Sequence, residues 1–216
     1  MKNLLIKRTG IYIVGIIFVS LGIVLCKKCG MGISPISSIP YVLTYILPLS
    51  FGVLTTCFHF VNIILQMFFS KKWIDPKLWL QVPLAFVFGW VIDGFNKLIM
   101  IDSTKIVYQI LALVLSIFFT ALGMVCMLDM NLIQNPPDGT VRQISILIGK
   151  KLGTVKVGYD IICVVISLVT GLVFLHSLTG FGLATVLSAI FVGKTINWIR
   201  SWLEKCNICL SDIERG

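Results

Sequence analysis

The side chains of this chain that could do chemistry form two rows within long apolar stretches. The first row has successive spacings of four, three and four residues and comprises Thr55, His59, Asn62 and Gln66. The second row has the same spacings and comprises Lys156, Asp160, Cys163 and Ser167. Side chains at these intervals share one face of a helix. Each row therefore predicts a polar face on an otherwise apolar helix.

Ionisable groups inside apolar helices are costly unless they face a protein interior or a cavity. His59 and Asp160 are therefore candidates for substrate binding or proton coupling, and so are Asn62, Gln66 and Lys156 of the same two rows. The alternative use is structural, because Asn and Gln often form hydrogen bonds between packed helices and Lys156 can pair with Asp160 one turn away. Asp93, in a third apolar stretch, is a further candidate.

Two short segments rich in glycine, proline and small polar residues interrupt the apolar sequence. They read "GMGISPIS" (30–37) and "NPPDG" (135–139). In each, a polar residue precedes a proline, as an N-cap residue precedes a helix. We expect two half-helices whose positive ends suit an anionic group of a substrate, with Ser37, Asn135 and Asp138 as candidate binding residues. For the second segment, an amphipathic helix on the membrane surface without a ligand is the alternative.

The composition excludes a soluble globular domain. Of 216 residues, 57% are apolar and only 12% are charged, and the mean hydropathy is +1.00. We therefore expect an all-α integral membrane protein. Six spans are predicted, near residues 10–26, 51–69, 79–100, 106–128, 155–175 and 181–199. They form a single membrane domain over residues 1–199, followed by a short cytoplasmic tail, 200–216.

The formal charge of +9 comes largely from lysine and arginine residues that flank the predicted spans. Such residues normally mark the cytoplasmic side of a membrane protein, so we expect no nucleic-acid partner. Their distribution predicts that both termini are cytoplasmic, in a multi-pass protein of a bacterial plasma membrane. The lipid bilayer is the first expected partner.

Two Cys-x-x-Cys pairs, Cys26 with Cys29 and Cys206 with Cys209, have a spacing seen in zinc sites. The predicted topology places them on opposite sides of the membrane, so we expect neither a metal nor another cofactor. The sequence also contains no recognisable catalytic motif, and only two histidines, His59 and His176. An enzyme is therefore not expected.

The chain resembles itself at an offset of 101 residues, which superposes Ile16 on Ile117, Phe18 on Phe119, Leu21 on Leu122, Gly22 on Gly123, Val24 on Val125, Pro35 on Pro136 and Gly52 on Gly153. The two polar rows coincide at the same offset. The repeats cover about 9–100 and about 106–199. Because each holds three spans, the second must enter the membrane from the opposite side, as in many secondary transporters. A duplicated scaffold with its function elsewhere is the alternative.

The motifs Gly-x-Gly-x-x-Pro (30–35), "NPPDG" (135–139), "KKLGTVKVGYDI" (150–161) and "GFGLATVLSAIFVGKTIN" (180–197) together resemble the YczE/YitT group of bacterial multi-pass membrane proteins. Most members of this group are uncharacterised. The resemblance implies an aspartate in both broken segments. Ser37 stands where the first is usual, whereas Asp138 is retained, so a symmetric pair of carboxylates is in doubt.

These observations favour a small-solute permease that works by alternating access. The substrate, which could carry an anionic group, would bind near the middle of the membrane, between the two broken segments and the two polar rows. A substrate-binding or accessory subunit is the alternative, using the basic segment 141–151 to contact a partner protein. A membrane-embedded regulator is a third. A homo-oligomer and a complex with a partner membrane protein are both compatible with the sequence.

Overall fold

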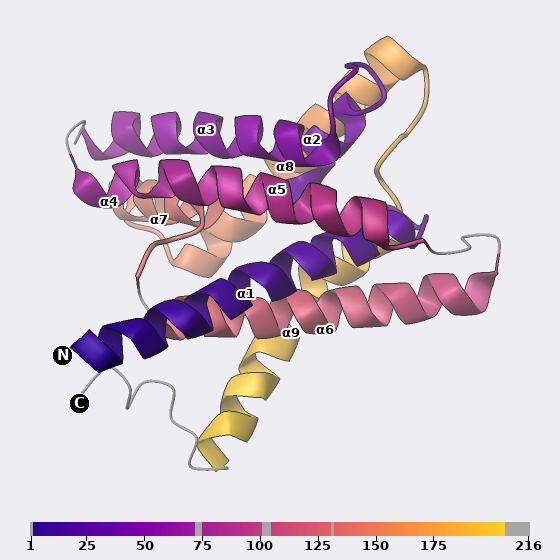
Figure 1. Ribbon diagram of the computed structural model, residues 1–216. Helices are drawn as coiled ribbons and strands as arrows, with labels where there is room; N and C mark the ends of the chain where they lie inside the picture. Colours follow the sequence, from indigo (N-terminus) through magenta and orange to yellow (C-terminus); the bar gives the residue numbers. More distant parts are fainter. Residues whose placement is uncertain (1, 72–74, 101–104, 131, 206–216) are drawn as a thin grey trace.

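The computed structural model describes residues 2–71, 75–100, 105–130 and 132–205, and within these ranges its regular structure is entirely helical. The first half of the chain forms α1 (Lys2–Lys28), the 3-10 turn η1 (Pro35–Ser37), α2 (Ser38–Leu43), α3 (Phe51–Ser70), α4 (Pro76–Trp79) and α5 (Gln81–Leu98). The second half forms α6 (Ile106–Met130), α7 (Pro136–Ile148), α8 (Leu152–Leu175) and α9 (Leu183–Lys205). Figure 1 shows the short helices α2 and α7 lying among the long helices of the bundle.

Within the described residues, five segments are long and apolar enough to cross a membrane: Leu5–Lys28, Phe51–Ser70, Pro76–Leu98, Ile106–Met130 and Leu152–Leu175. They confirm the first five predicted spans. The helix at the sixth position, α9, has 23 residues and therefore sufficient length. It is less apolar because Lys194, Asn197 and Arg200 lie along it, so its membrane crossing stays a prediction. It also continues to Lys205, into the segment predicted as a tail.

The offset of 101 residues found in the sequence also relates the helix boundaries. The two half-helices begin at Pro35 and Pro136, and α3 and α8 begin at Phe51 and Leu152. In Figure 1, α7 lies toward the side on which α1 begins, and α2 toward the side on which α1 ends. The two half-helices therefore enter the bundle from opposite sides, as predicted for an inverted repeat.

The helices α1 and α6 cross at the centre of the bundle through a symmetric pair of glycines. A Cβ atom on Gly22 would lie 2.7 Å from the backbone N of Thr120, and one on Gly123 would lie 2.6 Å from the backbone N of Val19. Gly22 and Gly123 are counterparts at the offset of 101 residues, and so are Val19 and Thr120. The contact of Gly22 with Thr120 in one direction therefore repeats as the contact of Gly123 with Val19 in the other. This is the contact expected where two related helices cross a two-fold axis.

The two repeats differ in how their last two spans pack. In the first repeat, Gly52 of α3 and Gly89 of α5 bring the two backbones into contact. Their counterparts in the second repeat are Gly153, which has no neighbour within 4 Å of a built Cβ, and Ile190. Ile190 lines a groove of about 280 Å³ that separates α8 from α9. The first pair of spans is therefore closed and the second is parted.

The second broken segment is not a helix on the membrane surface. Pro136, Pro137, Gly139, Thr140 and Val141 are buried, which places the start of α7 inside the protein between α3 and α8. Its exposed residues are Arg142 and the last turn, Ile146–Ile148. The structure therefore favours the half-helix over the surface-helix alternative.

Candidate functional site

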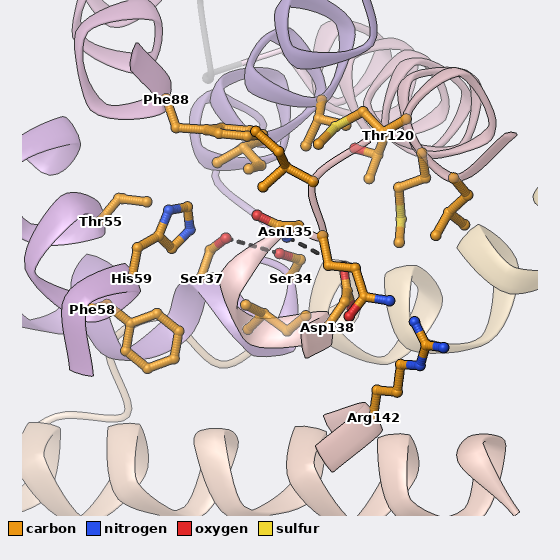
Figure 2. Close-up of a pocket in the computed structure, with 18 of the residues that line it drawn as sticks. Ser34, Ser37, Thr55, Phe58, His59, Phe88, Thr120, Asn135, Asp138 and Arg142 are labelled. Atoms are coloured by element: carbon orange, nitrogen blue, oxygen red, sulfur yellow. Dashed lines mark hydrogen bonds between the residues drawn. The ribbon is translucent and has the colours of Figure 1, made fainter. Parts of the chain in front are cut away.

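A cavity of about 190 Å³ lies where the two half-helices begin. Its polar lining comes from both half-helix starts and from α3, and includes Ser34, Ser37, Thr55, His59, Asn135 and Asp138. Part of its apolar lining comes from α1 and α6, namely Val19, Ile23, Met124, Met127 and Leu128. Figure 2 shows the polar side chains directed into this space. The site thus unites residues of both repeats.

His59 is the most deeply buried ionisable group of the cavity wall. Its side chain is 4% exposed, and its ring packs edge-on against Phe88 of α5 with 5.5 Å between ring centroids. The Nδ1 atom is buried and has no hydrogen-bond partner among the described residues. Leaving such an atom unpaired is unfavourable, so a polar partner supplied from the cavity would stabilise it.

Ser34 and Asn135 occupy the predicted N-cap positions, but neither side chain caps a backbone N–H. Ser34 Oγ donates to Ser37 Oγ at 3.2 Å, and Asn135 Nδ2 donates to Asp138 Oδ2 at 3.2 Å. The amide orientation of Asn135 follows from this bond, since only its nitrogen can donate to a carboxylate. Asn135 Oδ1 is left buried without a partner among the residues that the structure describes.

The half-helix starts offer few backbone donors to a ligand. Pro136 and Pro137 have no N–H, and the N–H of Gly139 donates to the carbonyl of Asn135 at 2.9 Å. At the other start, Pro35 has no N–H, and the N–H of Ser37 donates to the carbonyl of Ser34 at 3.0 Å. The capacity of these ends to bind an anion is therefore smaller than the proline-led sequences suggest.

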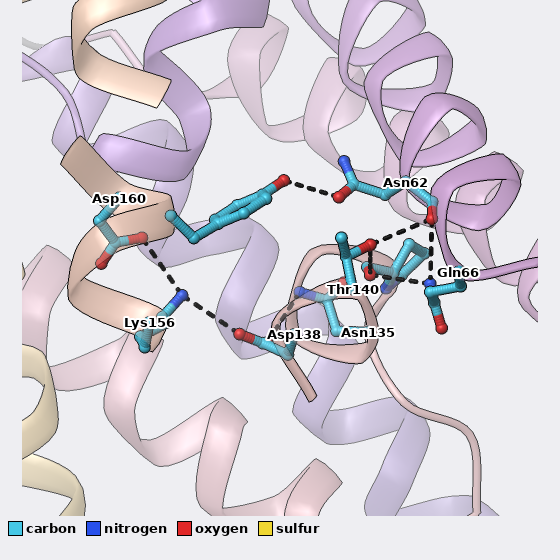
Figure 3. A network of polar contacts seen from close by, with 9 residues as sticks. Asn62, Gln66, Asn135, Asp138, Thr140, Lys156 and Asp160 are labelled. Carbon is cyan, nitrogen blue, oxygen red and sulfur yellow. Dashed lines mark hydrogen bonds and ion pairs between the residues drawn. The ribbon is translucent and has the colours of Figure 1, made fainter. Parts of the chain in front are cut away.

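Lys156 of α8 lies between the two aspartates predicted as site residues, as Figure 3 shows. Its Nζ is 3.2 Å from Asp138 Oδ1 and 3.5 Å from Asp160 Oδ1, and the second pair is an ionic contact without a hydrogen bond. Asp138 lines the cavity, whereas Asp160 lines the groove between α8 and α9. Asp138 and Asp160 thus share Lys156 as their counter-ion, but they line different hollows of the protein.

The Gln66 side chain and the Asn62 backbone hold α7 in place, the Asn62 side chain binds α8, and neither residue lines the cavity. Gln66 Nε2 donates to the carbonyl of Pro136 at 2.9 Å, and Thr140 Oγ1 donates to the carbonyl of Asn62 at 3.0 Å. Tyr159 of α8 donates to Asn62 Oδ1 at 2.6 Å. For these two side chains the structure supports the alternative reading, hydrogen bonding between packed helices.

The polar row on α8 supports the other half-helix in the same manner. Ser38 Oγ of α2 donates to the carbonyl of Cys163 at 3.2 Å, and Ser167 Oγ donates to the carbonyl of Ser38 at 3.1 Å. Asn62 and Gln66 are the counterparts of Cys163 and Ser167 at the offset of 101 residues. Each row therefore anchors the half-helix of the other repeat.

Asp93 lies away from the cavity, at the start of α3. Its Oδ1 accepts a hydrogen bond from the N–H of Gly52 at 2.8 Å, and its Oδ2 accepts one from the hydroxyl of Ser50. A carboxylate at this place neutralises the positive end of the helix. Asp93 thus holds the α3–α5 contact together and takes no part in the candidate site.

Of the two Cys-x-x-Cys pairs, only the first lies in the described part of the chain. Cys26 and Cys29 are buried, and Cys29 Sγ donates to the carbonyl of Cys26 at 2.9 Å. Cys206 and Cys209 lie outside the described residues. The prediction that the pairs share no metal is therefore not tested.

The model of one protein family, described as "Family of unknown function (DUF6198)", matches residues 6–201 of this chain. The chain belongs to this family. No curated protein and no solved structure matches it. The DUF6198 match extends over both repeats, both half-helices and every residue of the cavity. Its description does not include the YczE/YitT group, so that finer resemblance stays a prediction.

Three residues of this DUF6198 protein matter to the site and were not predicted. Arg142, an exposed residue one turn after Asp138 on α7, lies at the cavity mouth. Thr120 lines the cavity opposite its counterpart Val19. Tyr159 holds Asn62. Helical spacing from Asp138 could have identified Arg142, and the offset of 101 residues could have identified Thr120.

Proposed function

We propose that this protein is a secondary permease for a small solute, which binds in the cavity between the two half-helix starts. The observation that carries the proposal is the meeting of two half-helices, from opposite sides, at a cavity with buried and unpaired His59 Nδ1 and Asn135 Oδ1. Inverted repeats around a central site are the usual architecture of such carriers.

The position of the cavity mouth supports this proposal. The exposed residues of the lining are Leu128, Arg142 and Leu152, at the end of α6, on α7 and at the start of α8. In Figure 1, α7 and the end of α6 lie toward the side on which α1 begins. Toward the opposite side, Phe51, Phe88 and Ile92 are at most 2% exposed. A solute could thus reach the cavity from one side only in this conformation.

The difference between the repeats also supports alternating access. The α3–α5 pair is closed, whereas the α8–α9 pair is parted by a groove. In a carrier with inverted repeats, each half can adopt the arrangement of the other. The second conformation would close α8 on α9 and expose the cavity to the opposite side. Lys150 and Lys151 directly precede Leu152 of the present mouth, so we assign that side to the cytoplasm of a bacterial cell.

A metabolite-uptake experiment tests the proposal. Proteoliposomes containing the purified protein are incubated with a bacterial metabolite extract, filtered, and analysed by mass spectrometry. We expect saturable accumulation of one or a few solutes relative to protein-free vesicles, and loss of that accumulation in His59→Ala. Vesicles of Val61→Ala, an exposed position on the same helix, are the control. Equal solute contents in all preparations would contradict a carrier.

A substrate-binding or accessory subunit is the second candidate. The end of α7 favours it, because Ile146, Leu147 and Ile148 are 67%, 60% and 51% exposed beside Lys150 and Lys151. Such an apolar turn beside lysines would suit a partner protein or the membrane surface. Solute binding without accumulation in the same vesicles would favour this role.

A further inference from the structure

The cavity contains hydrogen-bonding groups of both kinds that lack a partner. Asn135 Oδ1 is a buried acceptor, and His59 Nδ1 is a buried atom that donates or accepts according to its tautomer. Ser37 is 5% exposed, and its hydroxyl accepts from Ser34, which leaves its own proton free to be donated into the cavity. A ligand that satisfies these groups needs at least one donor and one acceptor.

The carboxylate of the cavity lining already has a counter-ion, which it shares with Asp160 of the separate groove. Asp138, the carboxylate of the lining, has Lys156 at 3.2 Å and accepts a hydrogen bond from Asn135. The prolines at both half-helix starts remove backbone donors that would otherwise hold an anion. Arg142 is exposed at the mouth, where water screens its charge. A charged head group inside would lose its hydration without gaining a counter-ion, which is strongly unfavourable.

The remaining wall sets the size and polarity of the ligand body. Val19, Ile23, Met124, Met127 and Leu128 form an apolar surface opposite the half-helix starts. The cavity volume is about 190 Å³. An apolar cavity of about 150 Å³ accommodates benzene, so this one has room for a ring-sized body and a short head group.

We propose that the cavity binds a small uncharged molecule with a ring-sized apolar body and a head group of the primary carboxamide type. The head group donates to Asn135 Oδ1 and accepts from His59 or Ser37, while the body lies against α1 and α6. This inference rests on the proposed function, in which the cavity is the solute site. It replaces the anionic substrate expected from the sequence by a neutral one.

Equilibrium binding with a matched series of probes tests the inference. Detergent-purified protein is titrated with radiolabelled benzamide at neutral pH, and bound label is competed with benzoate or benzylamine, which have the same ring and opposite charges. We expect saturable benzamide binding and about tenfold weaker competition by either charged probe, because each buries an unmatched charge. Tighter binding of benzoate or benzylamine, or no benzamide binding, would overturn the neutral head group.

Three variants locate the binding site. His59→Phe keeps the ring against Phe88 but removes both nitrogens, and Ser37→Ala removes only a hydroxyl. We expect each to weaken benzamide binding about tenfold or more, and Val61→Ala to leave it unchanged. Unchanged affinity in both His59→Phe and Ser37→Ala would place the bound probe elsewhere and overturn the inference. Metabolite uptake by the unmodified protein would still decide the proposed function separately.

Discussion

At the scale of single residues, Gly139 on α7 packs closely against the side chain of Gln66 on α3. A Cβ on Gly139 would collide with the Gln66 amide, which also donates to the carbonyl of Pro136. We expect Gly139→Ala to displace Gln66 and to lower the free energy of unfolding by about 1–3 kcal/mol.

The matched control for this change is Gly158→Ala on α8, where a Cβ would meet nothing within 4 Å. Because alanine favours a helix over glycine, that variant should be neutral or more stable by up to about 1 kcal/mol. Unfolding in detergent micelles measures both. Equal effects of the two variants would mean that the Gly139 contact does not hold α7.

Lys156 is the shared counter-ion of Asp138 and Asp160. We expect Lys156→Met to destabilise the protein by about 1–3 kcal/mol, less than for fully buried pairs because all three side chains are partly exposed. Adding Asp138→Asn and Asp160→Asn should restore most of the loss, since no unpaired charge then remains. The unfolding free energies of the single and triple variants measure this, and a single variant as stable as the parent protein would contradict the shared pairing.

Residue types and spacing were sufficient to find His59, Asn135 and Asp138, which the structure brings to one cavity. They were not sufficient to separate these from Asn62 and Gln66, which hold α7, or from Asp93, which holds the start of α3. Helical periodicity tells which residues share a face. It does not tell what that face meets, because the partner comes from a segment far away in the sequence.

At the scale of elements, the crossing of α1 and α6 depends on two related glycines. We expect Gly22→Ala and Gly123→Ala to destabilise the protein by similar amounts, about 1–3 kcal/mol each, because each Cβ would meet backbone of the other helix. Gly10→Ala on α1, with no neighbour within 4 Å, is the control. Thermal unfolding of the three variants measures this. A large effect at only one of the two crossing glycines would contradict the two-fold relation.

The positions of both half-helices could be predicted, because proline after a polar residue is a local signal for a helix start. Five spans could also be predicted from apolar length alone. The contact between α3 and α5 and the gap between α8 and α9 could not. The contact depends on Gly89 in the first repeat, and the gap on Ile190 at the corresponding position of the second. The effect of this difference is visible only once the helices are placed together.

At the scale of the whole molecule, the two repeats form a nearly two-fold bundle in which one pair of spans is closed and the other is parted. The cavity opens on one side, near Arg142 and Leu152. Alternating access therefore requires a second conformation, in which α8 and α9 approach each other. In that conformation Val157 and Ile190 would be in contact, as their counterparts Thr56 and Gly89 are in this one.

A disulfide cross-link between α8 and α9 tests this requirement most directly. Val157→Cys and Ile190→Cys are introduced together, after replacement of the seven native cysteines, and Ile162→Cys with Phe191→Cys on the exposed faces is the control pair. We predict that the first pair forms a disulfide under oxidation, that solute uptake by proteoliposomes stops, and that reduction restores it. Unimpeded uptake by the cross-linked protein, or uptake by a protein in which this pair never cross-links, would contradict the alternating-access account.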